Sequence, residues 1–336
     1  MRISRVLVTA AIALASAGVI AGCSGSGSTS SQSVMPSNGM QSHAISHDGT
    51  GVAPKFLTNL HFGAGLPAVR PDAGAPHFLA VSDFGTGAVE ILNHAYNLHQ
   101  TITSGLNGPD GDWYDQAGNL YVANYNGPYV QEYAPGGSSP SVTYSTGLGD
   151  PINVTTDESS NVYVVDYNFG GAGFVNEYTQ GLNQVSHTCS LPGAPEGIAV
   201  GETGAVFVSY NNGSTANIVE YRHGLTGCHA HLLGVGLNFA GGMQIDNHKN
   251  LVACDQTAGA IDIIAPPYSS VTSSITGYTD PFHVALNKGN SLMFVADVGA
   301  AVVYVQNYPS GSLVTTLGSS NGLVDPAGIA TFPYLH

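Results

Sequence analysis

Four polar residues of this 336-residue chain follow a proline by one or two positions, and their types could support metal-assisted or acid–base chemistry. Three of them, Asp110, Asn153 and Glu196, carry oxygen ligands. Carboxylate and amide oxygens are the ligands that calcium and other hard divalent cations prefer, so we predict a divalent-cation site from these three residues. The fourth is His283, whose side chain has an ordinary pKa near neutrality. We therefore consider His283 a candidate general base, with Glu196 orienting it or acting as the catalytic acid.

The same residue types also have a purely structural explanation. Asp and Asn beside Pro and Gly stabilise tight turns, because their side chains accept hydrogen bonds from the nearby backbone. A histidine at such a position can equally be solvated or held by structural hydrogen bonds. Both interpretations stay open for Asp110, Asn153, Glu196 and His283 at this point.

These residues belong to a phrase that recurs along the chain. In each copy a short apolar segment is followed by a Gly/Asn-rich turn and a second apolar segment. The first segments are Leu79–Asp83, Leu120–Asn124, Val162–Asp166, Val206–Tyr210, Leu251–Asp255 and Met293–Asp297, and their last residues are 41, 42, 44, 45 and 42 positions apart. Short segments rich in Val, Tyr and Phe and separated by Gly, Asn and Pro predict antiparallel β-strands.

A period of about 40 to 45 residues with four short strands is the length of one propeller blade. The six copies therefore predict an all-β, six-bladed β-propeller. A phrase of the form Pro-x-Gly, or a variant such as Gly241–Met243, marks entry to the innermost strand, so the four polar residues are expected where these strands enter the central channel. The last copy, Asp325–Thr331, leaves no room for another blade, and we expect it to complete the first blade and close the ring.

Over roughly residues 65–336 the chain resembles the NHL-type six-bladed propellers and, more broadly, the gluconolactonase/regucalcin-like and streptogramin-lyase-like groups, with the best match in Pro109–Asn124. The likeness to gluconolactonases implies calcium or another divalent cation in the central channel, polarising a lactone carbonyl. Asp110 in Pro-Asp-Gly matches that family's aspartate phrase, whereas Asn153 and Glu196 match in type but not in their order along the chain. The likeness to streptogramin lyases implies a channel histidine, here His283. Such rings also include pure binding platforms, so the resemblance is specific for the fold.

The N-terminus resembles a bacterial lipoprotein signal. Arg2 and Arg5 precede an apolar run from Val6 to Ile20, which is too short for a comfortable membrane span, and small residues lead to Cys23. We therefore predict lipidation of Cys23 and attachment to a membrane through this lipid only. The predicted organisation is a signal peptide over 1–22, a flexible Ser/Gly-rich tether over 23–55 and the propeller over 56–336. The expected location is the bacterial cell envelope, on its periplasmic or cell-surface side.

The charge of the chain narrows the class of partner. Seven Lys and Arg stand against 22 Asp and Glu, which gives a formal net charge of −15. Such a surface is a poor match for nucleic acid, because phosphate binding depends on basic side chains. We expect a monomer whose partner is a protein or a glycan bound on one face of the ring.

Cysteines in the predicted outer strands of two consecutive blades suggest an oxidising compartment. Cys189 and Cys228 would form a disulfide if their Cα atoms approach to about 4.4–6.8 Å. The same segments also contain His187, His229 and His231, which together with Cys189 could supply four nitrogen and sulfur ligands to zinc as the alternative. The remaining Cys254 lies within a blade strand and is expected to be a buried small hydrophobe.

Two functions follow from these patterns. The first is a lipid-anchored, extracytoplasmic, NHL-like propeller that acts as a binding or scaffold module, which we favour because Gly241, Gly242, Ala327 and Gly328 bring no functional groups to the channel. The alternative is an enzyme, either a metal-dependent lactonase or a streptogramin-lyase-like enzyme, that uses Asp110, Asn153, Glu196 and His283. The ligand or substrate is not defined by the sequence.

Overall fold

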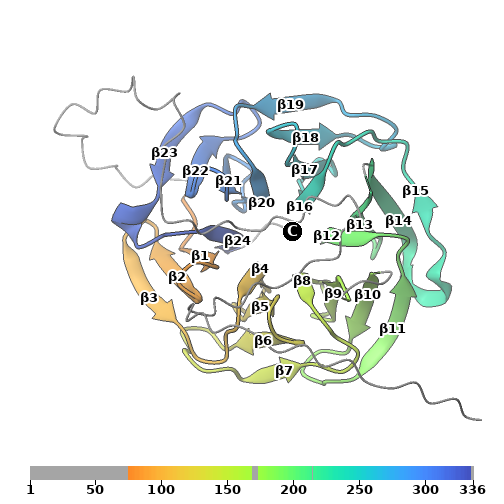
Figure 1. The fold of residues 1–336 in the computed structure, drawn as a ribbon, viewed down its shortest axis with the longest axis horizontal. Coiled ribbons are helices and arrows are strands. Elements are labelled where there is room, and N and C mark those ends of the chain that lie inside the picture. The colour runs from red at the N-terminus through yellow and green to blue at the C-terminus, as the bar shows by residue number, and fades with distance from the viewer. Residues whose placement is uncertain (1–74, 169–172, 214, 334–336) are drawn as a thin grey trace, which may run out of the picture. The chain divides into compact units, whose positions relative to one another are not determined.

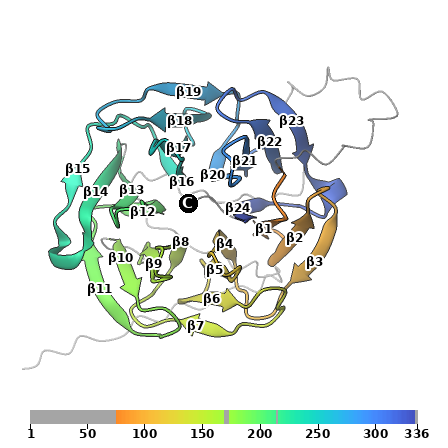
Figure 2. The ribbon, with the colours of Figure 1, turned by 180° about the vertical axis from the view of Figure 1, so that it is seen from behind.

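The structure is a computed structural model that describes residues 75–168, 173–213 and 215–333. The predicted signal peptide, Cys23 and the predicted tether lie outside the described residues. The described chain forms six antiparallel four-stranded sheets arranged as blades around a central axis, as Figures 1 and 2 show from opposite sides. The all-β, six-bladed propeller expected from the repeats is thereby confirmed.

In each blade the strands follow one another from the axis outward. Blade 1 contains β24 (Pro326–Phe332), β1 (Phe78–Asp83), β2 (Ala88–Asn93) and β3 (Leu98–Ile102), and blade 2 contains β4 (Pro109–Tyr114), β5 (Leu120–Asn124), β6 (Tyr129–Tyr133) and β7 (Val142–Tyr144). Blade 3 contains β8 (Pro151–Thr156), β9 (Val162–Asp166), β10 (Phe174–Tyr178) and β11 (Val185–Ser190), and blade 4 contains β12 (Ala194–Val200), β13 (Val206–Asn212), β14 (Thr215–Leu225) and β15 (His231–Leu232). Blade 5 contains β16 (Ala240–Ile245), β17 (Leu251–Asp255), β18 (Ala260–Ile264) and β19 (Ser273–Thr276), and blade 6 contains β20 (Pro281–Leu286), β21 (Leu292–Asp297), β22 (Val302–Asn307) and β23 (Leu313–Leu317).

The C-terminal strand closes the ring. Strand β24 pairs with β1 in an antiparallel register that runs from Phe78 opposite Phe332 to Asp83 opposite Pro326. The first blade therefore takes its innermost strand from the end of the chain and its other three strands from the beginning. This arrangement pairs an edge that an open array would leave exposed.

The recurring Asp at the end of the second strand has a structural role. Asp166 accepts hydrogen bonds from the backbone N–H groups of Gly149 (2.6 Å) and Asp150 (2.9 Å), just before inner strand β8. Asp297 accepts equivalent bonds from the loop before β20. Each carboxylate thus fixes the loop that delivers the chain into the channel, which explains why the residue type repeats.

The apolar core lies between neighbouring blades. Leu79 and Val81 of β1 pack in one cluster with Phe294 of β21 and Val305 of β22, which joins blades 1 and 6. The hydroxyl of the fully buried Tyr178 donates to the carbonyl of Thr146 at 2.8 Å, so the ring is buried while its polar atom is satisfied. The blades therefore depend on one another for burial of their faces.

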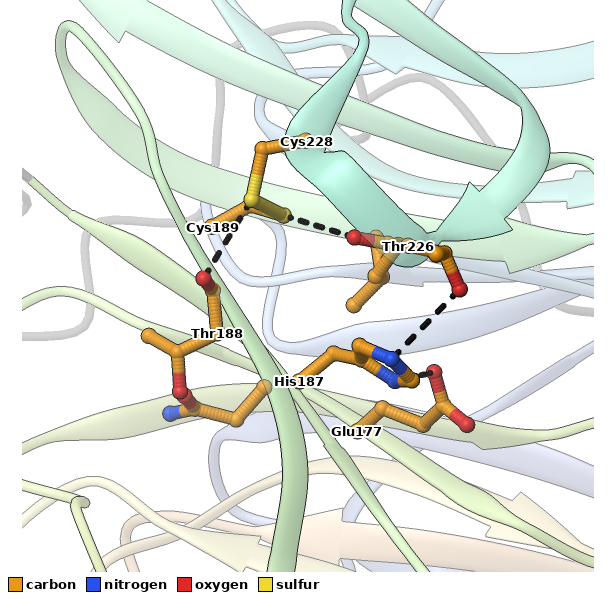
Figure 3. Close-up of a disulfide and its surroundings, with 8 residues drawn as sticks. Glu177, His187, Thr188, Cys189, Thr226 and Cys228 are labelled. Atoms are coloured by element: carbon orange, nitrogen blue, oxygen red, sulfur yellow. Dashed lines mark hydrogen bonds and ion pairs between the residues drawn. A yellow bond between two sulfur atoms is a disulfide. The ribbon is translucent and has the colours of Figure 1, made fainter.

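Cys189 and Cys228 form a disulfide, with their Cα atoms 5.4 Å apart (Figure 3). Cys189 lies on β11 of blade 3 and Cys228 ends the short 3-10 helix η2 (Thr226–Cys228) after β14 of blade 4. The bridge joins the outer edges of two blades and removes the thiolates that a zinc site would need, so the zinc alternative is not supported. Cys254 is a free, buried thiol.

The described segments contain two short 3-10 helices, η2 and η3 (Ser319–Asn321). Within residues 75–333, apart from the short gaps, no helix has the length and apolarity needed to span a membrane.

Candidate functional site

All six inner strands carry an irregularity near their start, immediately after Pro109, Pro151, Pro195, Ala240, Pro281 and Pro326. In blade 4, for example, Pro195 pairs with Tyr210 while Gly197 pairs with Ser209, so Glu196 is an extra residue. We call the end of the ring where the inner strands begin the mouth. The residues directly after these six positions form a bulge layer at the mouth, made of Asp110, Ile152, Glu196, Gly241, Phe282 and Ala327. The next residues form a second layer, made of Gly111, Asn153, Gly197, Gly242, His283 and Gly328.

The second layer has only two side chains, and these meet across the channel. Asn153 belongs to blade 3 and His283 to blade 6, which are opposite each other in a six-membered ring. Asn153 Nδ2 lies 3.0 Å from His283 Nε2 and 3.3 Å from the carbonyl oxygen of Glu196. The other ring nitrogen, His283 Nδ1, accepts the backbone N–H of Ile329 at 3.0 Å. We call this pair the crossbar, because it forms the floor of the mouth.

Glycine in the second layer is required for the crossbar to fit. A Cβ atom on Gly242 would lie 2.0 Å from Cδ2 of His283, and one on Gly111 would lie 2.6 Å from Oδ1 of Asn153. Real Cβ contacts are not this short. The glycines that bring no chemistry of their own therefore make room for the two side chains that cross the channel.

Burial has a strong effect on His283. The residue is 6 % exposed, and loss of solvation lowers the pKa of its imidazole from 6.5 to about 4. At neutral pH the ring is therefore uncharged. Taking up a proton at Nδ1 would also break its bond with Ile329.

The bulge layer above the crossbar contains two carboxyl groups. Asp110 is 6 % exposed, and none of the described residues donates a hydrogen bond to its buried Oδ1. Burial, and then the nearby charge of Asp112, raise the pKa of Asp110 well above its usual range. Burial and the charge of Asp110 likewise raise the pKa of Glu196, whose Oε1 accepts a 3.3 Å bond from Asn211. The two groups therefore act on each other at the mouth.

A further buried carboxyl lies one residue beyond the second layer. Asp112 accepts two hydrogen bonds from Ser82, one from the backbone N–H at 2.8 Å and one from the hydroxyl at 2.5 Å. Burial raises the pKa of Asp112 to about 7 in spite of these bonds. The sequence analysis did not single out Asp112, although it lies two residues after Asp110 in Pro-Asp-Gly-Asp.

Two cavities lie beyond the bulge layer. The first, of about 10 Å³, is lined by Asp112, Asn153, Gln244, His283 and Thr331 among others, and its size is that of a single water. The second, of about 150 Å³, lies near the far ends of β8, β12 and β16 and has Trp113, Phe207 and Tyr268 in its wall. Its wall also contains the carboxyl groups of Asp157, Glu202 and Asp246, so acidic side chains lie at both ends of the inner strands.

The structure arranges the four predicted residues as two pairs. Asp110 and Glu196 lie at the mouth, and Asn153 and His283 form the crossbar beneath them. Asn153 contacts both His283 and the backbone of Glu196, and so connects the two layers. Within the described segments no group of three or more His, Cys, Asp or Glu side chains is arranged to hold a metal ion. Metal binding by Asp110, Glu196 and the amide of Asn153 stays a prediction.

This geometry defines a six-bladed β-propeller with a polar, acidic channel mouth. No protein-family model and no curated protein sequence matches the chain. Among solved structures it is similar to a chain in a nidogen/laminin complex, with 15% identity, a TM-score of 0.61, and coverage of 75% of this chain and 97% of that one. A protein of unknown function from Bacteroides caccae aligns with 12% identity and a TM-score of 0.61 over 76% of this chain and 98% of that chain. A streptogramin B lyase structure aligns with 11% identity and a TM-score of 0.48 over 73% and 74%. The first two likenesses show the fold alone.

Proposed function

We propose that this protein is a lipid-anchored, extracytoplasmic binding module that engages a protein or glycan partner through the mouth of its propeller. The observation that carries the proposal is the crossbar. His283, the candidate general base, is buried, uncharged at neutral pH and bonded through Nδ1 to the backbone of Ile329. An imidazole held in this way is better suited to a structural role in the floor of the mouth than to proton transfer.

The chemistry above the floor is that of a recognition surface. Asp110 and Glu196 come from rigid inner strands, and the half-buried Tyr125 and Tyr167 lie in the loops just after β5 and β9. Tyrosine beside carboxyl groups offers an apolar face together with hydrogen-bonding atoms, a combination common in binding sites. Such an arrangement can hold a ligand without any reaction.

The lipid anchor is part of the proposal and rests on the N-terminal sequence. A lipid on Cys23 followed by a Ser/Gly-rich segment would hold the ring near a membrane surface. We expect radiolabelled palmitate to be incorporated by the full chain in a bacterial host and not by Cys23→Ser. Labelling of both proteins, or of neither, would remove the anchor from the proposal.

The binding role is tested with the full chain on glycan and peptide arrays. Asp110→Asn and Glu196→Gln change the mouth while keeping side-chain shape, and Glu202→Gln, between β12 and β13, changes the other end of the ring as a matched control. We expect the two mouth variants to lose at least tenfold in affinity for whatever the unmodified chain binds, and the control to retain it. Equal binding by all four proteins would place the binding surface elsewhere and contradict the proposal.

The second function is a metal-dependent lactonase or a lyase, and the effect of the Asp110 charge on Glu196 across the mouth favours it. Both carboxyl groups could be ligands of one divalent cation, with Asn153 as a third oxygen ligand. Calorimetric titration with calcium, followed by lactone turnover assays, separates this enzyme from the binding module. Stoichiometric calcium uptake that Asp110→Ala and Glu196→Ala both abolish, together with turnover, would favour the enzyme.

A further inference from the structure

The mouth contains hydrogen-bond acceptors that lack donors. The buried Oδ1 of Asp110 receives no hydrogen bond from the described residues. Gln256 follows β17 in blade 5, beside Gly241, and donates from Nε2 to the carbonyl of Ala240 at 3.2 Å. Its buried Oε1 likewise receives no bond from the described residues. A buried acceptor left without a donor is destabilising, because it has lost its hydrogen bonds to water, so a ligand that donates hydrogen bonds would relieve either atom.

Basic residues are distributed unevenly along the propeller axis, whereas acidic residues occur at both ends. Nine acidic residues lie at the mouth, either just before an inner strand, near its start, or at the end of the neighbouring second strand. They are Asp83, Asp110, Asp150, Asp166, Glu196, Asp255, Asp280, Asp297 and Asp325. The Lys and Arg residues of the described segments are Arg222, Lys249 and Lys288. Lys249 and Lys288 lie in the turns at the far ends of β16 and β20, and Arg222 lies towards the same end of β14. The mouth therefore has no Lys or Arg from the described residues to balance its carboxyl groups.

Aromatic side chains complete the wall of the mouth. Burial, and then the nearby charges of Asp110, Asp150 and Glu196, raise the pKa of the Tyr125 phenol above its usual range. Phe84 follows β1 in the neighbouring blade, and its ring centroid is 6.5 Å from that of Tyr125. Aromatic faces beside carboxylates attract organic cations, because the ring quadrupole and the negative charges act in the same direction.

We propose that the mouth binds a primary alkylammonium group, with Asp110 and Glu196 as its anionic partners and the aromatic wall around its alkyl chain. The inference rests on the binding role proposed above and names the chemistry that the mouth recognises. An ammonium group carries three N–H donors, and the orphaned oxygens of Asp110 and Gln256 are suited to receive them. The crossbar of Asn153 and His283 blocks deeper entry, so one end of the ligand is enclosed and the rest projects outward.

Ammonium fits the mouth better than a bare metal ion or a quaternary amine. A metal would need at least three ligands at short range, and since the described Asp, Glu, His and Cys side chains form no such group, it would depend on amide oxygens such as that of Asn153. A quaternary amine has no N–H to give to the unpaired acceptors. The raised pKa values of Asp110 and Glu196 agree with a site that holds protons until a cation replaces them.

Two sources share this chemistry, a free amine and a lysine side chain of a bound polypeptide. The test uses isothermal titration calorimetry of the full chain with n-butylammonium and with Nα-acetyl-lysine N-methylamide. Nα-acetyl-norleucine N-methylamide, which lacks the amine, is the neutral control, and calcium chloride is run separately. Tighter binding of the lysine derivative than of n-butylammonium assigns the site to lysine side chains, and the reverse order assigns it to free amines.

We expect one ammonium probe per ring, at least tenfold weaker binding by Asp110→Asn and by Glu196→Gln, and unchanged binding by Glu202→Gln. We also expect protons to be released on binding at pH 7, measured from the dependence of the heat on the buffer. The variants must keep the thermal transition of the unmodified protein, which separates loss of the site from loss of the fold. Asparagine and glutamine preserve the shapes of the two side chains, so these variants should fold.

Three outcomes would overturn the proposal. They are no binding of either ammonium probe at millimolar concentration, equal binding of the norleucine control, and calcium binding that needs Asp110 and Glu196 while ammonium does not bind. The binding role survives each of these outcomes if array ligands still depend on the mouth variants. It fails separately if no array ligand does.

Discussion

Asn153 and His283 come from inner strands on opposite sides of the ring, and their Nδ2 and Nε2 atoms meet across the channel at 3.0 Å. In the sequence Asn153 suggested a cation ligand and His283 suggested a general base. In the structure the two side chains contact each other and form one unit. It also divides the channel, with carboxyl groups on one side and a water-sized cavity below. The location of the candidate binding site at the mouth follows from this single contact.

The crossbar makes Gly242 intolerant of a side chain. We expect Gly242→Ala to lower the free energy of unfolding by about 1–3 kcal/mol, because the new Cβ would lie 2.0 Å from the His283 ring and force it to move. Chemical denaturation followed by the fluorescence of Trp113 measures the loss. Gly236→Ala is the matched control, since a Cβ there meets no atom within 4 Å.

The origin of that loss can be checked with a double variant. His283→Ala removes the clashing ring, so Gly242→Ala should cost less in this background than in the unmodified protein. If the two losses simply add, the crossbar does not explain the requirement for glycine.

The buried carboxyl groups make stability depend on pH. Burial raises the pKa of Asp112 from 3.8 to about 7, so the folded chain holds a proton that the unfolded chain releases between these values. The free energy of unfolding should therefore fall as pH rises through this window, and Asp110 and Glu196 act in the same direction. His283, with its pKa lowered to about 4, opposes this by reducing stability as pH falls below 6.5. We expect the three carboxyl groups to outweigh one imidazole, giving a higher Tm at pH 5 than at pH 8.

The variant Asp112→Asn tests how much of this pH dependence of stability comes from Asp112. An asparagine oxygen can still accept the Ser82 N–H, and the Ser82 hydroxyl can turn to accept from the new amide, so the fold should be kept. Differential scanning calorimetry should give a smaller difference in Tm between pH 5 and pH 8 for this variant. An unchanged difference would mean that Asp112 does not titrate in this range.

The repeat pattern predicted the six blades, the closing strand and the position of the four polar residues at the start of inner strands. Each of these features depends on local sequence, because every blade repeats the same short strands and four of the six repeat the loop-fixing Asp, such as Asp166. The sequence did not predict which side chains meet. The single-residue bulge sends Glu196 and Asn153 into different layers, although each follows a proline closely.

The crossbar could not be predicted for a related reason. Asn153 and His283 are 130 residues apart, and their contact depends on the diameter of the closed ring and on glycine in the four other blades. In the sequence the glycines Gly241, Gly242 and Gly328 indicate only that their blades bring no functional groups to the channel. In the structure Gly242 is required by the bulk of His283.

Ring closure depends on β24. We expect deletion of residues 326–336 to abolish the cooperative thermal transition seen by circular dichroism, because the deletion exposes the edge of β1 and removes Ile329 from the cluster between blades 1 and 6. It also removes Thr331, whose hydroxyl donates to the Leu286 carbonyl of β20 at 2.7 Å. Deletion of 334–336 alone, which spares β24, is the control. A full-strength transition in the longer deletion would show that the ring does not need this strand.

The disulfide between Cys189 and Cys228 makes stability depend on redox state. The bridge spans 39 residues and ties two blades at their outer edges, so its loss should cost about 2–4 kcal/mol, chiefly through the greater freedom of the unfolded chain. We expect Cys228→Ser to lower Tm and to be insensitive to dithiothreitol, whereas Cys254→Ala keeps the sensitivity of the unmodified protein because Cys254 is unbridged. A bond of this kind persists in oxidising compartments, so protein made with its first 22 residues and exported should melt higher than protein retained in a reducing cytoplasm. Identical melting of the two preparations would argue against both the bridge and the extracytoplasmic location.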